Sequence, residues 1–122
     1  MSSETIRRIS RDRQLASLGD AFVNFIYSLA LTQINGRPQA TKVSDRILSE
    51  AFRLAGLREY LGTRLSRKDL ANAAEALLVE AYRKQLISID ESVSILSENP
   101  DDPNVGLSNL LKLAAERIGK IT

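Results

Sequence analysis

Two of the chemically most versatile side chains are missing from this sequence: its 122 residues include no cysteine and no histidine. The absence of cysteine excludes disulfides, thiol catalysis and zinc sites built on cysteine. The absence of histidine excludes a Ser-His-Asp triad, a histidine general base and any histidine-ligated transition metal. Any catalysis must therefore use carboxylates, lysines, hydroxyls or a metal held through oxygen.

Aromatic residues are also scarce, at 5% of the chain against 43% for hydrophobic residues as a whole. The core must therefore consist of Leu, Ile, Val and Ala, a mixture that favours helices over a sandwich or barrel. No uninterrupted apolar run approaches the ~20 residues of a membrane-spanning helix, and the N-terminus lacks the apolar segment of a signal peptide. We expect a single cytoplasmic domain over residues 1–122, without a membrane segment.

The net charge is only +2, but it is unevenly distributed. Residues 1–86 hold 14 Lys and Arg against 9 Asp and Glu, whereas residues 87–122 hold 3 against 6. Basic residues gather in two clusters, one made of Arg7, Arg8, Arg11 and Arg13 and the other of Arg53, Arg58, Arg64, Arg67 and Lys68. Such clusters suit phosphate backbones. A solvated face with ordinary salt bridges is the alternative.

The spacing of apolar residues predicts helices throughout, and no segment has the alternation of a strand. The expected helices, about five, cover approximately residues 10–34, 44–55, 66–86, 88–96 and 104–121. Gly56 is placed to end the second helix, Ser88 begins a segment of capping-box form, and residues 97–103 make an acidic turn. The first helix is expected to bury a stripe made of Leu15, Leu18, Phe22, Phe25 or Ile26, and Leu29. The predicted fold class is therefore all-α.

Two acids lie away from the predicted core stripes, on helix sides that are otherwise mostly small or apolar. At 100° per residue, Asp20 lies opposite the predicted stripe of the first helix, among small or apolar neighbours. Glu75 likewise lies away from the inner stripe of its helix, whereas Glu80 has Lys84 four residues on as a surface partner. If the two helices pack together, Asp20 and Glu75 could share a divalent ion, since Mg²⁺ prefers oxygen ligands. An ordinary ion pair with a basic residue is the alternative that the spacing leaves open.

The run LASLGDAFVNFI, residues 15–26, resembles the signature helix of ribonuclease III proteins, in which Leu-Gly-Asp carries a metal-binding acid. The family's second element, an Asp followed three positions later by Glu and then Ala-Leu, is similar to Asn72-Ala-Ala-Glu75-Ala-Leu. The likeness is narrower to archaeal, stand-alone ribonuclease III-like proteins without a double-stranded-RNA-binding domain. It rests there on the Val-Asn-Phe-Ile stretch and on the run LAGLR, residues 54–58. The resemblance covers about residues 14–96.

This resemblance implies a helical ribonuclease III-like domain that cuts double-stranded or structured RNA. Asp20 and Glu75 would be catalytic, and together with Asn72 they would hold Mg²⁺ or Mn²⁺. The family acts as a homodimer, which would cover a second apolar face of the first helix. The basic residues Arg53, Arg58, Arg64, Arg67 and Lys68 would line the RNA path and contact phosphates and 2′-hydroxyls.

Two departures from the family pattern bear on activity. Ala16 stands where the family usually has an acid, a loss that minimal members share. Asn72 stands where an active enzyme usually has aspartate; its carbonyl can bind Mg²⁺ but adds no charge, so metal affinity should fall. Asp69 could compensate, although its direction on the helix lies nearer Glu80. The alternative function is therefore a catalytically impaired RNA-binding or ribosome-associated protein, and a third is a purely structural helical dimer.

Overall fold

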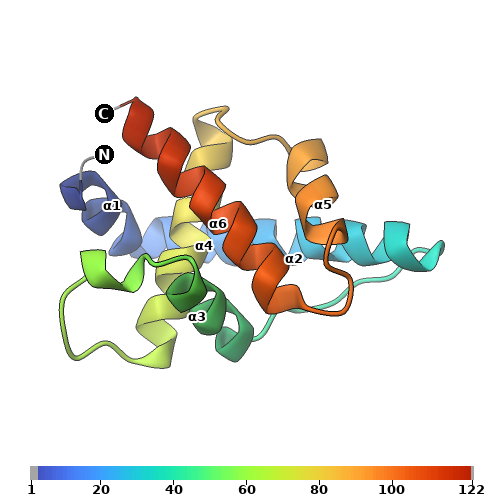
Figure 1. Cartoon of the computed structure of the whole chain (residues 1–122), viewed down its shortest axis with the longest axis horizontal. Coiled ribbons are helices and arrows are strands. Elements are labelled where there is room, and N and C mark those ends of the chain that lie inside the picture. The colour runs from blue at the N-terminus through green and yellow to red at the C-terminus, as the bar shows by residue number, and fades with distance from the viewer. Residues whose placement is uncertain (1–2, 122) are drawn as a thin grey trace.

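The computed structural model describes residues 3–121. Within them it has six α-helices, one 3-10 turn and no strand. These elements are α1 (Ser3–Ser10), α2 (Arg13–Asn35), α3 (Asp45–Leu54), η1 (Arg58–Tyr60), α4 (Arg67–Arg83), α5 (Ile89–Ser97) and α6 (Pro103–Lys120). The all-α prediction is confirmed, with six helices rather than about five (Figure 1).

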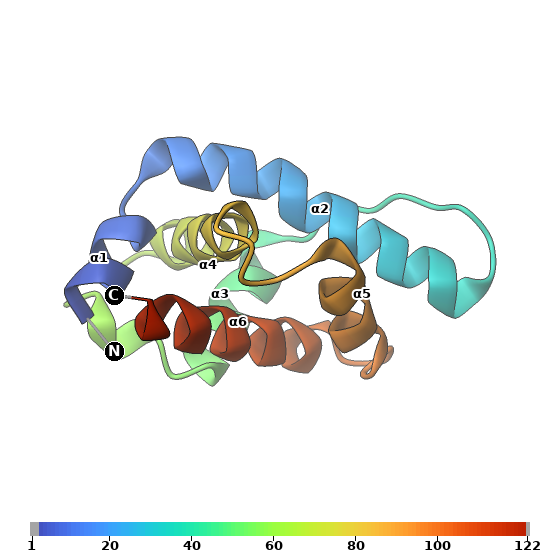
Figure 2. The same cartoon turned by 90° about the horizontal axis from the view of Figure 1, so that it is seen from above.

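Helix α4 lies at the centre of the fold. Figure 2 shows it between α2 on one side and α6 on the other. Helix α3 packs against both α4 and α6, and α5 bridges α2 and α6. Because α4 is covered on several sides, most of its residues are buried, and many of them are alanines. Small side chains let the surrounding helices approach α4 closely.

The helix predicted over residues 10–34 is α2, and the separate helix α1 that precedes it was not predicted. The side chain of Asp12 accepts hydrogen bonds from the N–H groups of Gln14 and Leu15, both at 3.0 Å, and so starts α2 at Arg13. This is a standard N-cap arrangement, which interrupts the chain after α1. Helix α1 is anchored by the buried side chains of two isoleucines. Its eight residues are too few to give a clear apolar period.

The buried stripe of α2 is rotated from the predicted one. The buried residues of this helix are Leu15, Ala16, Gly19, Phe22, Val23, Ile26 and Ala30. Leu18, which was expected in the core, is 51% exposed; of the alternatives Phe25 and Ile26, Phe25 is 52% exposed and Ile26 is buried. The side of the helix that carries Asp20 is therefore packed against the core, as its apolar neighbours indicated, and the side that is left exposed is also apolar.

The other helices begin and end close to the predicted residues. Gly56 follows α3 with a φ of 75°, and the N–H of Leu57 donates to the carbonyl of Phe52 at 3.3 Å, as in a Schellman motif. Helix α4 begins after Ser66 in a complete capping box. It ends at Arg83, three residues before the predicted end.

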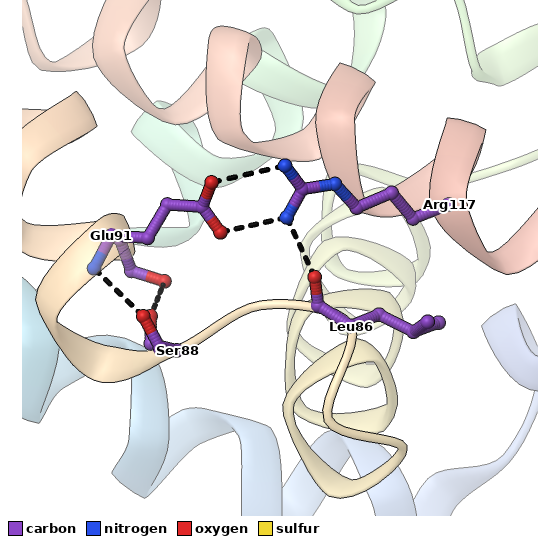
Figure 3. Close-up of polar contacts among 5 residues, drawn as sticks. Leu86, Ser88, Glu91 and Arg117 are labelled. Atoms are coloured by element: carbon purple, nitrogen blue, oxygen red, sulfur yellow. Dashed lines mark hydrogen bonds and ion pairs between the residues drawn. The ribbon is translucent and has the colours of Figure 1, made fainter.

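A single guanidinium fixes α6 to the segment around the start of α5. Ser88 caps α5 by accepting the N–H of Glu91 at 2.9 Å, but the carboxylate of Glu91 does not complete the predicted capping box. It accepts two hydrogen bonds from Arg117, at 2.7 and 3.0 Å, and Arg117 also donates to the carbonyl of Leu86 at 2.7 Å (Figure 3). These charge-assisted contacts lower the pKa of Glu91 and join the C-terminal helix to the loop after α4.

Helix α2 is long and apolar enough to cross a bilayer by length and composition alone. The core helices of soluble proteins pass the same test, and α2 packs here against α4 and α5. The absence of a membrane segment stays a prediction from the sequence.

Candidate functional site

Helix α2 crosses α4 so closely that only glycine fits at position 19. A Cβ atom built on Gly19 would overlap the backbone carbonyl group of Glu75 and lie 2.9 Å from its Cβ. An alanine would therefore push the two helices apart or distort them. The glycine of the Leu-Gly-Asp element thus lets the next residue, Asp20, reach Glu75.

Asp20 and Glu75, which the sequence predicts to meet, line one open cavity of about 810 Å³, here called the acid cavity. Glu75 is only 5% exposed, and neither acid forms an ion pair within residues 3–121. Burial, a hydrogen bond with Asp20 and the charge of Asp20 raise the pKa of Glu75 to about 8; the charge of Asp45 adds to this, and Lys68 opposes it. Glu75 therefore keeps its proton at neutral pH, and this protonated carboxyl group donates a hydrogen bond to Asp20.

Asn24 holds Asp20 in place. Its Oδ1 accepts the N–H of Val43 at 2.8 Å, which leaves its Nδ2 to donate to the carboxylate of Asp20 at 3.4 Å. The second bond is long and weak. Through it Asp20 is nevertheless linked to the segment between α2 and α3, which forms one wall of the acid cavity.

Two further polar side chains of α2, one and two turns after Asn24, also bind the backbone of the segment that follows the helix. The hydroxyl of Ser28 exchanges hydrogen bonds with the backbone of Thr41, and that of Thr32 does the same with the backbone of Gln39. Polar side chains at every fourth position therefore hold the returning chain along the helix. This role of Asn24, Ser28 and Thr32 was not predicted. Its signal in the sequence is the four-residue spacing of these polar residues within an apolar helix.

Asn72 also lines the acid cavity, one turn before Glu75. It is half-buried, and its amide makes no side-chain hydrogen bond to the part of the chain described here. Asp69 lines the cavity as well, which corrects the expectation that it points toward Glu80. Its carboxylate accepts the N–H of Ser66 at 2.9 Å, and this hydrogen bond lowers the pKa of Asp69. Asp69 is thus engaged in capping α4, whereas Asn72 is free to bind a ligand.

The oxygen donors of the acid cavity fit a hydrated divalent ion. Across residues 3–121 no three carboxylates lie close enough to hold a metal, so the candidate donors are Asp20, Glu75 and the amide of Asn72. Mg²⁺ is commonly bound by one or two carboxylates and keeps several waters. A buried acid that holds a proton beside a second acid provides a place where a cation can replace that proton.

Of the five basic residues predicted to line an RNA path, Lys68 alone borders the acid cavity. Its Nζ lies 3.5 Å from the carboxylate of Asp45, a cavity residue that the sequence analysis did not single out. The other four, Arg53, Arg58, Arg64 and Arg67, lie outside the cavity, three of them exposed and Arg58 half-buried. Arg13 and Lys42 also border it, so three cations surround the acids.

The Gly19→Ala variant tests the close crossing of α2 and α4. We expect it to lower the free energy of unfolding by about 1–3 kcal/mol through overpacking, measured by urea denaturation. Gly106→Ala is a matched control, because its added Cβ would lie 3.5 Å from the nearest atom, the carbonyl oxygen of Leu96. That change should leave stability unchanged or raise it by about 0.5–1 kcal/mol through helix propensity. Equal effects of the two substitutions would contradict the crossing.

The raised pKa of Glu75 predicts a pH-dependent stability. The unfolded chain releases this proton near pH 4.5 and the folded chain near pH 8, so the contribution of Glu75 to the free energy of unfolding falls as pH rises through that window. Glu75→Gln cannot ionise and should gain stability relative to the wild type as pH rises, in urea titrations with EDTA present. Glu98→Gln, at an exposed position, should follow the wild type. A constant difference between Glu75→Gln and the wild type would rule out a protonated Glu75.

Comparison with known proteins identifies the family of this chain. A family model described as ribonuclease III matches residues 13–120, which include α2, α4 and all the residues of the predicted metal site. A search of curated proteins found no match. The match leaves α1 and Arg11 outside it. Because it covers most of the sequence, the resemblance seen in the Leu-Gly-Asp and Glu-Ala-Leu elements is confirmed, and the chain belongs to the ribonuclease III family.

Proposed function

We propose that this protein is a Mg²⁺-dependent endoribonuclease that cuts double-stranded or structured RNA, with Asp20 and Glu75 as its catalytic metal ligands. Members of the ribonuclease III family generally use a divalent metal and bind RNA. The observation that carries the proposal is the contact of these two carboxylates, without a cationic ion-pair partner among the described residues, in an open cavity. Mn²⁺ has the same preference for oxygen ligands.

The part played by the chain follows from the geometry. Asp20 and Glu75 would hold the ion, and Glu75 would release its proton to solvent so that its carboxylate could act as a ligand. Mg²⁺ bound there supplies an activated water and stabilises the charge that develops on the phosphate. The amide oxygen of Asn72 adds a neutral donor, and Asn24 limits the rotation of Asp20.

An RNA cleavage assay tests the proposal. The purified protein should cut duplex RNA with Mg²⁺ or Mn²⁺, and Asp20→Asn should lower the rate by at least about 100-fold because a charged ligand is lost. Asn72→Asp should reduce the metal concentration needed for half-maximal activity, because it restores an acidic donor. Glu98→Gln serves as the control and should cleave like the wild type. A wild type inactive with both metals would refute the enzyme proposal.

Asn72 favours a second candidate, an RNA-binding protein that has lost catalysis. On this reading the wild type binds RNA in a salt-sensitive manner without cutting it, and sediments with large RNA-protein particles. Failure to bind RNA at low salt would exclude it. The narrower likeness to stand-alone archaeal proteins and the cytoplasmic location stay predictions from the sequence.

The homodimer is proposed on the exposed apolar side of α2. Leu18 and Phe25 are about half exposed, two turns apart on this side. Tyr82 of α4 extends the surface, because it is 39% exposed and its ring lies 4.9 Å from that of Phe22. A second copy is the occupant that the family resemblance implies, and a two-fold contact would place the same residues against each other.

Sedimentation measures this interface. The wild type should sediment as a dimer, and Phe25→Arg should shift it to monomers because a buried charge opposes association. Ile34→Arg is the matched control, since Ile34 is an exposed apolar residue of the same helix about 180° away from Phe25. It should remain dimeric. A monomeric wild type, or the same shift in both variants, would argue against this interface.

A further inference from the structure

The corner between α1 and α2 carries charged residues that the metal site does not use. Arg11 and Asp12 form the link between the two helices, and Arg13 is the first residue of α2. The ribonuclease III match starts at Arg13, so Arg11 and Asp12 lie outside the matched residues.

Helix α1 packs against η1, which belongs to the second basic cluster, residues 53–68. The Nε of Arg7 donates to the carbonyl of Tyr60 at 3.1 Å, and α1 lies against η1 (Figure 1). The clusters at residues 7–13 and 53–68 are far apart in the sequence. The fold thus places the N-terminal cluster beside the start of the segment that precedes α4.

A second cavity of about 310 Å³, here called the corner cavity, lies in this place. Ser10, Arg11 and Arg13 line it from the corner, and Leu61 and Leu65 line it from the segment before α4. It shares with the acid cavity the lining residues Arg13, Ala16, Asp69 and Asn72. A strand of nucleic acid that reaches Asp20 and Glu75 therefore has the corner cavity directly beside it.

The polar groups of the corner leave its two arginines available. Arg11 and Arg13 are exposed and form no ion pair within the described residues. Asp12 and Asp69 also line the corner cavity, but their carboxylates accept backbone N–H groups at the starts of α2 and α4.

Ser10 also lines the corner cavity. It is only 6% exposed, and its hydroxyl oxygen, which protein atoms cover, has no hydrogen-bond partner within the described residues. Leaving such a hydroxyl unpaired costs stability.

We propose that the corner cavity binds a backbone phosphate of the RNA, next to the position cut at Asp20 and Glu75, through the guanidinium groups of Arg11 and Arg13. Guanidinium groups suit this task because their paired N–H donors match two phosphate oxygens. The contact is independent of base sequence and adds affinity near the site of cleavage. This inference rests on the proposed function, since it assumes that RNA is the ligand.

The test measures the binding of an RNA duplex in EDTA, so that no cleavage occurs, over a range of KCl concentrations. The double variant Arg11→Ala/Arg13→Ala should make the slope of log affinity against log salt shallower by about 1, because one phosphate contact is lost. Arg11→Lys/Arg13→Lys should keep the wild-type slope, since both charges remain. Circular dichroism checks that each variant is folded.

Arg37→Ala/Lys112→Ala removes the same charge from exposed positions outside both cavities, and its slope should stay near that of the wild type. An unchanged slope in the Arg11→Ala/Arg13→Ala variant, or an equal change in the control, overturns this inference and leaves the cleavage proposal standing. A wild type that binds no RNA at low salt overturns both.

Discussion

The close crossing of α2 on α4 is the contact on which the rest of the structure depends. Gly19 has no side chain to hold the helices apart, so its neighbour Asp20 comes against Glu75. Within the Leu-Gly-Asp element, the glycine lets the two helices approach closely, and the aspartate contacts Glu75 because they do. The alanines of α4 serve the same end, because they allow α2, α3 and α6 to surround it.

This arrangement places function and stability in opposition. Glu75 is 5% exposed and faces Asp20. Both conditions disfavour its ionised state, so its pKa is raised and it keeps a proton. The side chains of Asn24, Ser28 and Thr32 accept hydrogen bonds from backbone N–H groups of the segment after α2, and these bonds oppose the repulsion between the two acids. They keep one wall of the acid cavity in place, so the acids stay together despite their repulsion.

Much of the fold and part of the site could be predicted from the sequence. Periodicity and capping residues gave the all-α class and most helix ends, and the position of Asp20 among apolar neighbours correctly indicated a covered face. Periodicity could not decide which of two apolar sides of α2 meets the core, so Leu18 was misplaced. The separate α1 was missed because its eight residues are too few to show a clear apolar period. The place of Asp69 in the acid cavity depends on how α2 crosses α4, which the sequence does not specify.

The amide at position 72 changes a balance between proton and metal, and not only the number of ligands. An aspartate there would add a negative charge one turn from Glu75, which would raise the pKa of Glu75 further and bind both protons and cations more tightly. The asparagine weakens both kinds of binding. Asp45 and Asp69 border the same cavity, but Arg13, Lys42 and Lys68 border it too and offset their charge, and no third acidic ligand joins the two acids among the described residues. At the proposed metal site, an amide at position 72 would lower the affinity for the ion, but it would also lower the cost of removing the proton that the ion would replace.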